Sequence, residues 1–385
     1  MCAYEWMPMT TYGMLSTYPP TQCGLATFAA ALSHALRTQQ DRISVVAMAD
    51  DPRATVPAEV DRLWVRGSVD GARSVAAQLN TTDVAILQHE YGIFGGADGV
   101  DVVDAMARVR VPLITVFHTV LEAPTPRQRF IIEDLAARSD SIVTMTASAR
   151  QRLIVKYRVD ATKIVVIPHG ADATHLTGAV PTRDNDRPVI LTWGLLGAGK
   201  GIEWGIAAMA LLADLNPRPI YRIVGKTHPK VVENEGERYR RGLEAQVAHD
   251  GLGDVVEFDA RYLTVPDLQQ IVAGADVVLL PYDSLDQVTS GVLVEAVTAG
   301  KPVISTRFPH AVELLSHGVG ILVDRGNPEQ IAHAVRRLVT DPKTARDMSA
   351  AARQVAPELL WSTVAERYRD VAENLLTKTR VRISA

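Results

Sequence analysis

The sequence predicts an α/β protein of two domains, each built on a parallel sheet that helices cover on both faces. Short continuous apolar segments alternate with longer segments of helical periodicity along the chain, a pattern typical of buried parallel strands joined by helices. The alternation is interrupted once, by the polar residues 170–187, and then restarts. A length of 385 residues also fits two or three domains. We therefore place an interdomain linker at 170–187.

The first half of the chain contains six predicted strands, at residues 10–16, 43–47, 83–87, 111–117, 141–145 and 163–167. Between them, segments such as 26–36 and 130–137 place apolar residues at helical spacing. Residues 1–175 are expected to form the N-terminal domain.

The second half repeats this pattern with six strands, at residues 189–193, 221–224, 255–258, 276–280, 302–305 and 320–323. Helices are expected at 202–215, 237–249, 265–273, 291–299, 328–339 and 344–356, and a last one at about 363–376 follows Trp361. Residues 188–360 are expected to form the C-terminal domain. The predicted architecture resembles two Rossmann-like domains that face each other across a cleft.

Composition excludes several classes of function. The chain has 40 basic and 44 acidic residues and a net charge of −4, so no positive excess indicates a nucleic-acid partner. Two cysteines, Cys2 and Cys23, exclude a disulfide framework, and no metal-ligand spacing such as HExxH occurs. No segment approaches the ~18 consecutive apolar residues of a transmembrane helix, and the N-terminus does not resemble a secretory signal. We expect a soluble cytoplasmic protein, with contact to a membrane surface left open.

Polar and glycine-rich segments follow many of the predicted strands. Ligands of open parallel sheets bind beyond the carboxyl ends of the strands. The segments that lie there are 18–24, 88–92, 117–119, 144–148, 194–201, 225–229, 260–263 and 281–291. Exposed loops would explain any one of them, but eight together favour a ligand cleft.

The segment 193–201 (WGLLGAGKG) is the sharpest local signal. It joins a strand to a helix, where backbone amides and the helix N-terminus can bind an anion. Gly194, Gly199 and Lys200 nearly match the P-loop spacing, but Gly201 stands where that motif needs a hydroxyl for Mg²⁺. The sequence therefore favours phosphate binding by Lys200 over triphosphate hydrolysis, and a plain tight turn is the alternative.

The segment 286–295 is the second signal. A helix is expected to begin near Ser290 or Gly291, where free amides and the helix dipole favour a phosphate. Glu295 lies one turn further, among apolar residues, and a carboxylate in such surroundings needs a partner. Ribose hydroxyls would serve, and a salt bridge to an arginine or lysine is the alternative.

Other polar residues at strand ends are less specific. His118 follows a predicted strand and taken alone would be a strand-end residue, as would His89 with Glu90. Lys226 and His228 could bring positive charge to the cleft or be ordinary loop residues.

These motifs together resemble the retaining glycosyltransferases of family 4, which have the GT-B fold. The resemblance runs from Pro19 to Trp361. Its most specific part is 290–303 (SGVLVEAVTAGKPV), followed by 313–315 (ELL) and 320–323 (GILV), and 167–172 (IPHGAD) resembles the segment between the two domains. In such enzymes the nucleotide sugar lies mostly on the second domain and the acceptor mostly on the first.

The resemblance implies a role for each matching residue. Glu295 would hold the ribose, Lys200 would neutralise the diphosphate, and His118 would reach the donor sugar. Backbone groups of Ser290, Gly291 and Val292 would contact the diphosphate, Gly24 would lie near the phosphates, and residues 261–263, with Tyr262 and Leu263, would meet the base. The final helix, 361–380, would join the first domain.

Two positions depart from the family pattern. Gln287 stands where the family has a second glutamate, eight positions before Glu295, and Leu195 follows Gly194 where the family tends to have an arginine. Gln287 can still bind sugar hydroxyls, and Lys226 or Arg307 could compensate for the missing arginine.

The function implied is transfer of a hexosyl group, mannose or glucose, from a nucleoside-diphosphate sugar to a hydroxyl acceptor, with retained configuration. No cofactor is expected, and Lys200 with the helix dipole would make a metal dispensable. The acceptor would be a carbohydrate, a lipid or a small molecule. The alternatives are a nucleotide-sugar-binding protein without turnover and, less favoured, a P-loop-type nucleotidase.

Overall fold

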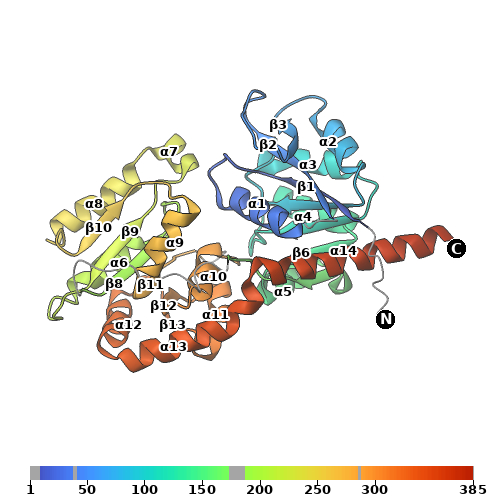
Figure 1. Cartoon of the computed structure of the whole chain (residues 1–385). Coiled ribbons are helices and arrows are strands. Elements are labelled where there is room, and N and C mark those ends of the chain that lie inside the picture. The colour runs from blue at the N-terminus through green and yellow to red at the C-terminus, as the bar shows by residue number, and fades with distance from the viewer. Residues whose placement is uncertain (1–8, 38–40, 173–186, 285–287, 385) are drawn as a thin grey trace, which may run out of the picture. The chain divides into compact units, whose positions relative to one another are not determined.

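The computed structural model describes residues 9–37, 41–172, 187–284 and 288–384. The chain divides into two compact units (Figure 1): unit 1 comprises Met1–Pro168 with Trp361–Ala385, and unit 2 comprises His169–Leu360. Most of the predicted linker, 173–186, lies outside the described residues.

Unit 1 is built on a seven-stranded sheet with the order β3-β2-β1-β4-β5-β6-β7, in which every pairing is parallel. The strands are β1 (Thr11–Ser16), β2 (Arg42–Ala49), β3 (Val60–Val65), β4 (Val84–His89), β5 (Leu113–Phe117), β6 (Ser141–Thr144) and β7 (Ile164–Val166). Six of them match the predicted strands within two residues. Strand β3 was not predicted, because this edge strand buries only Trp64 and carries exposed charged residues.

The helices of unit 1 are α1 (Gly24–Leu36), α2 (Gly71–Leu79), α3 (Asp101–Met106), α4 (Pro126–Arg138), α5 (Ala147–Tyr157) and α14 (Trp361–Ser384). The C-terminal helix α14 packs against α1, where the rings of Phe28 and Trp361 lie 5.0 Å apart. Val364, Ala365 and Tyr368 are fully buried in the same core as β1 and α1. This burial ties the last helix to unit 1.

Unit 2 is built on a six-stranded parallel sheet with the order β10-β9-β8-β11-β12-β13. Its strands are β8 (Val189–Trp193), β9 (Ile220–Val224), β10 (Val256–Asp259), β11 (Val277–Leu280), β12 (Val303–Thr306) and β13 (Gly320–Val323). All six lie within one residue of the predicted bounds. The α/β architecture with two parallel sheets is thereby confirmed.

The helices of unit 2 are α6 (Ile202–Ala210), α7 (Pro229–Glu235), α8 (Arg238–His249), α9 (Val265–Ala273), α10 (Gly291–Thr298), α11 (Pro309–Leu314), α12 (Pro328–Thr340) and α13 (Pro342–Val355). The prediction of a helix to residue 215 was wrong, because α6 ends at Ala210 and turns follow. The short helices α7 and α11 were not predicted. Each begins with a proline, which suits the first position of a helix.

The strand order fixes where a ligand can bind. In unit 2 the chain leaves β8 toward β9 on one side and returns through β11 on the other side, so the topological switch point lies between β8 and β11. In unit 1 the corresponding point lies between β1 and β4. Crevices at the carboxyl ends of strands at such points are the usual ligand sites of open α/β sheets.

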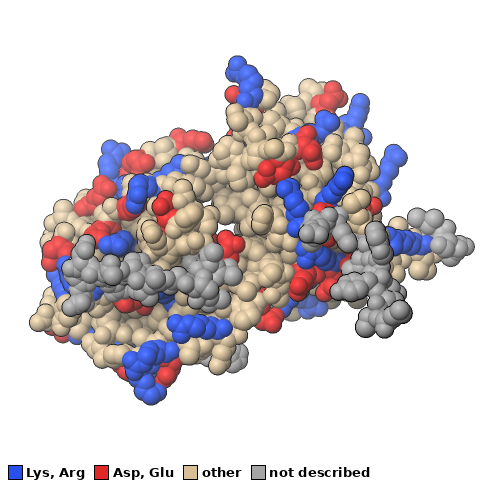
Figure 2. Space-filling model, viewed as in Figure 1, with Lys and Arg blue, Asp and Glu red and all other residues tan. Residues whose placement is uncertain are grey.

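The surface agrees with the small net charge. On the face drawn in Figure 2, Lys and Arg lie interspersed with Asp and Glu among uncharged residues. Across the described residues, no helix is both long and apolar enough to cross a bilayer.

Candidate functional site

At the carboxyl end of the unit 2 sheet, the loop after β8 packs closely against the loop that begins at Gly225, after β9. The loop after β8, residues 194–201, begins at Gly194, whose φ of +119° favours glycine. A Cβ placed on Gly194 would lie 3.7 Å from Val292, in the first turn of α10. On its other side, a Cβ on Gly225 would overlap the Gly194 carbonyl oxygen. The backbone of this loop therefore lies against both α10 and the end of β9.

Gly201 explains why the loop is not a P-loop. Its φ is +62°, and a Cβ at this position would overlap the carbonyl oxygen of Pro281 after β11. The amide of Asp283 also donates to the carbonyl oxygen of Gly199 at 3.0 Å. A serine or threonine at position 201, as the P-loop requires for Mg²⁺, is therefore excluded sterically.

Lys200 presents its ammonium group at this loop. The Nζ atom lies 4.4 Å from the ring centroid of Tyr282, which is 1% exposed and stacks on Phe308. Among the described residues, no carboxylate lies within ion-pair distance of Lys200. A cation held against an aromatic ring and without a protein counter-ion can bind an anionic ligand.

The N-terminus of α10 supplies amide donors beside this loop. Ser290 is the N-cap, and its Oγ accepts a hydrogen bond from the amide of Leu293 at 3.2 Å. The amide of Ser290 donates to Nδ1 of His310 at 2.9 Å. In the described part of the chain, the amides of Gly291 and Val292 have no acceptor, and both residues are partly exposed. Of the three predicted diphosphate contacts, the Ser290 amide is therefore already used inside the protein.

Glu295 lies one turn further along α10. Its Oε2 accepts a hydrogen bond from Nε1 of Trp193, the last residue of β8, at 3.1 Å. Burial raises the pKa of Glu295 to about 7, the Trp193 hydrogen bond opposes this, and the nearby Asp172 carboxylate adds to it. Within the described residues, Glu295 makes no salt bridge, so that alternative is wrong there. Taken as a whole residue, Glu295 is half-buried.

Residues at the ends of β9 and β10 form the adjoining part of the site. Lys226 Nζ lies 5.6 Å from the ring centroid of Tyr262, and Tyr262 is 44% exposed. Leu263 packs instead against the buried core. His228 caps α7 by accepting from the amide of Lys230, and burial, Lys230 and Lys200 together lower its pKa. The alternative that His228 supplies positive charge is therefore not supported.

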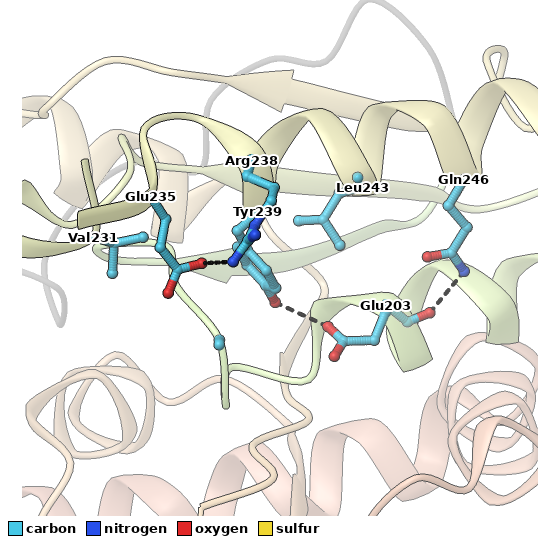
Figure 3. Close-up of a pocket in the computed structure, with 9 residues that line it drawn as sticks. Glu203, Val231, Glu235, Arg238, Tyr239, Leu243 and Gln246 are labelled. Carbon is cyan, nitrogen blue, oxygen red and sulfur yellow. Dashed lines mark hydrogen bonds and ion pairs between the residues drawn. The ribbon is translucent and has the colours of Figure 1, made fainter. Parts of the chain in front are cut away.

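A separate network of polar side chains lies beside the loop 194–201 (Figure 3). A pocket of about 380 Å³ is bordered by Ala198 of the loop and by α6, α7 and α8. In it, the Tyr239 hydroxyl donates to the Glu203 carboxylate at 2.9 Å, and Gln246 Nε2 donates to the Glu203 carbonyl at 3.0 Å. These polar groups satisfy one another.

Unit 1 contains two of the predicted residues, Gly24 and His118. Gly24 is the first residue of α1, and a Cβ there would meet nothing within 4 Å. His118, after β5, approaches Gln88 Oε1 with its Nε2 at 2.7 Å and packs edge-on against Phe28 of α1 at 4.8 Å. Because an amide oxygen only accepts, Nε2 of His118 carries the proton. His89 is fully buried among Tyr91, Phe94 and Phe117.

Two family models match almost consecutive parts of the chain. The model of "Glycosyltransferase Family 4" matches residues 23–175, and that of "Glycosyl transferases group 1" matches residues 178–355. Together with the two parallel-sheet units, these matches decide the family. The chain belongs to the family 4 glycosyltransferases.

Curated relatives agree with this assignment. The chain is 30% identical over 257 residues to the D-inositol 3-phosphate glycosyltransferase of Stackebrandtia nassauensis, a match that covers 64% of this chain and 56% of that protein. It is 26% identical over 270 residues to a glycogen synthase of Mycobacterium tuberculosis, covering 66% and 61%. The chain thus spans little more than half of the length of these relatives.

Solved structures show the same fold. The Anabaena protein HepE, crystallised in complex with UDP, has a TM-score of 0.76 at 19% identity, and the match covers 95% of this chain and 100% of HepE. A glycosyltransferase from Rickettsia africae has a TM-score of 0.77 at 14% identity, with coverage of 96% and 99%. The fold is therefore GT-B.

The structure brings five of the predicted donor-site residues together. Gly194, Lys200, Gly291, Val292 and Glu295 surround the switch point of unit 2 through the contacts described above. Gln287 lies outside the described residues.

Trp193, Tyr282 and His310, which contact Glu295, Lys200 and Ser290 respectively, were not predicted as site residues. Trp193 ends a predicted strand and Tyr282 lies in the polar segment 281–291, so their positions carried a usable signal. His310 lies 20 positions from its partner Ser290 in an unpredicted helix.

Proposed function

We propose that this glycosyltransferase transfers a hexosyl group from a nucleoside-diphosphate sugar to a hydroxyl acceptor, with retained anomeric configuration. One observation carries the proposal: a lysine with no carboxylate partner among the described residues, two helix-terminal amides without an acceptor there and a half-buried carboxylate all border one switch point. A nucleoside diphosphate needs this set of groups.

The diphosphate is assigned to Lys200 and the N-terminus of α10. The amides of Gly291 and Val292 point along the positive end of the helix dipole, which favours anions. As the anomeric bond breaks, negative charge grows on the departing diphosphate, and preorganised donors stabilise it. Lys200 supplies the positive charge, so no metal is required.

The nucleoside is assigned to Glu295 and Tyr262. An ionised Glu295 can accept hydrogen bonds from two ribose hydroxyls. The exposed ring of Tyr262, with Lys226 above it, would lie beside the base. Since the HepE structures were obtained with UDP and with UDP-glucose, uracil and glucose are the first base and sugar to test, ahead of guanine and mannose.

No protein nucleophile takes part in the proposed reaction. The departing phosphate oxygen accepts the proton of the attacking hydroxyl on the same face of the sugar, which retains the configuration. His118 would contact the donor sugar.

The acceptor is a carbohydrate, a lipid or a small molecule. The relatives named for inositol 3-phosphate make a phosphorylated cyclitol the first acceptor to try. A cytoplasmic location stays a prediction.

A nucleotide-sugar-binding protein without turnover is the second candidate. Leu195 follows Gly194 directly, so Lys200 lacks the arginine that the family tends to place there. An assay for nucleoside diphosphate released from the donor distinguishes the enzyme from the binding protein. A binding protein without turnover would bind the donor tightly but would release no nucleoside diphosphate.

A thermal-shift screen of nucleotide sugars tests the proposal. A true donor at 100 times its Kd adds about 2.7 kcal/mol to the free energy of unfolding. The Lys200→Ala variant should lose most of this gain, whereas Lys378→Ala, at an exposed position of α14, should keep it. An equal gain in Lys200→Ala and in the parent would contradict the diphosphate assignment.

A further inference from the structure

His310 makes an unusual contact with the N-terminus of α10. It lies in α11, is 4% exposed, and accepts the Ser290 amide proton on Nδ1 at 2.9 Å. Ser290 is itself the N-cap of α10 and is also 4% exposed. A buried imidazole from another helix therefore holds the backbone of the capping residue.

The imidazole serves as an acceptor because it is neutral. With Nδ1 accepting, the ring proton of neutral His310 is on Nε2. Burial, together with a smaller contribution from the neighbouring His169, lowers the pKa of His310 to about 3. The hydrogen bond therefore persists throughout the ordinary pH range.

The contacts around Ser290 determine which amides face a ligand. Its Oγ caps the amide of Leu293, and its own amide is bound to His310. Next to it, a Cβ on Gly291 would lie 2.8 Å from Nε2 of His169, so this ring closes one side of the helix start. With the cap fixed at both its amide and its side chain, the amides of Gly291 and Val292 have one orientation.

From these contacts, we propose that His310 is a positioning residue for the donor: it fixes the first turn of α10 so that the Gly291 and Val292 amides can bind the diphosphate. The inference rests on the proposed function, since it deepens the account of the same site. His310 acts through Ser290 and does not touch the nucleotide.

Two substitutions separate the hydrogen bond from packing. In His310→Asn, the side-chain oxygen can take the place of Nδ1 and accept the Ser290 amide. In His310→Leu, the volume is nearly kept but the buried amide loses its acceptor. His333→Leu, at an exposed position of α12, is the matched control.

The first measurement is UDP binding by calorimetry, followed by the donor KM and kcat. We expect His310→Leu to weaken UDP binding and to raise the donor KM by about tenfold, with a smaller change in kcat. His310→Asn should stay within about threefold of the parent, and His333→Leu should match it. Parent-like UDP affinity in His310→Leu would overturn the inference, as would equal losses in the Asn and Leu variants.

The second measurement needs no nucleotide. Amide hydrogen exchange of a peptide that spans residues 288–296 should be faster in His310→Leu than in the parent and unchanged in His310→Asn. Unchanged exchange in His310→Leu would also overturn the inference. If the parent itself binds no nucleoside diphosphate, the proposed function fails, and the role of His310 in donor binding fails with it. If the parent binds and the Leu variant binds equally well, only the inference fails.

Discussion

The loops that follow the strands of the two units differ in how their polar groups are used. In unit 1, His118 is bound to Gln88, the Thr119 hydroxyl donates to Glu90, and Glu122 forms ion pairs with Arg152 and Lys156. In unit 2, glycines bring the loops into backbone contact, and Lys200 with two helix-terminal amides is left without a protein acceptor among the described residues. Polar groups that have no hydrogen-bond or ion-pair partner among the described residues indicate a ligand site more directly than polar groups that are already paired.

The largest difference is expected for two glycine substitutions. Gly201→Ala adds a Cβ that overlaps the Pro281 carbonyl oxygen at a φ of +62°, so it should lower the free energy of unfolding by about 2–3 kcal/mol and abolish UDP binding. Gly24→Ala in unit 1 meets no atom within 4 Å, so the unfolding temperature should stay near that of the parent. Comparable destabilisation by both substitutions, measured by thermal unfolding, would refute this contrast between the loops.

The next largest difference is expected between Lys200→Ala in unit 2 and His118→Ala in unit 1, compared by their affinity for UDP. Lys200→Ala should weaken UDP binding by about tenfold to a hundredfold, since it removes a charged hydrogen-bond donor, and should leave the unfolding temperature unchanged. His118→Ala should leave the Kd for UDP within about threefold while it lowers turnover with the nucleotide sugar. A large loss of UDP affinity in His118→Ala, measured by calorimetry, would contradict the placing of the diphosphate on unit 2 alone.

The pH dependence of donor binding tests Glu295. Its pKa is raised to about 7, mainly by burial, so the ribose-accepting carboxylate forms only as pH rises through that value. We expect the donor affinity of the parent to increase from pH 6 to pH 8, and that of Glu295→Gln to be flat and weaker at pH 8.

Ionisation of Glu295, which should favour donor binding, should lower the free energy of unfolding. A carboxyl whose folded pKa is raised favours the folded state below the pKa of the unfolded chain and loses this contribution as pH rises through about 7. The parent should therefore lose stability relative to Glu295→Gln between pH 4.5 and 7. Parallel stability profiles of the two proteins would show that the carboxyl is not perturbed.

The smallest effect is expected for Trp193→Phe. This change keeps the aromatic packing at the end of β8 but removes the Nε1 hydrogen bond to Glu295. The cost should be about 1 kcal/mol of UDP binding, or close to fivefold in Kd. Trp64→Phe, on the edge strand of unit 1, is the control and should leave UDP binding unaffected. An unchanged Kd in Trp193→Phe would mean that the indole does not orient the carboxylate.

Local sequence patterns predicted most of the fold. Strands β8 and β13 and helix α9 agree with the predicted bounds residue for residue, because each combines an apolar run or helical period with a clear end signal. Strand β3 was missed because an edge strand needs little burial. The end of α6 was missed because the apolar pattern continues past Ala210 while the helix does not.

The site was predictable only in part. Lys200 and Glu295 stand out because glycines and apolar residues surround them in the sequence. The residues that orient them come from elsewhere in the chain: Trp193 lies 102 positions from Glu295, and Tyr282 lies after a different strand from Lys200. Such contacts follow from the strand order, which no single segment encodes.

A crystal structure of the protein soaked with UDP would show directly whether Lys200 and the N-terminus of α10 bind the diphosphate. We expect a diphosphate at about 3 Å from Lys200 Nζ and from the amides of Gly291 and Val292, with ribose hydroxyls on the Glu295 carboxylate. A UDP molecule ordered at another place, with Lys200 still lying against Tyr282 and no phosphate near α10, would contradict it.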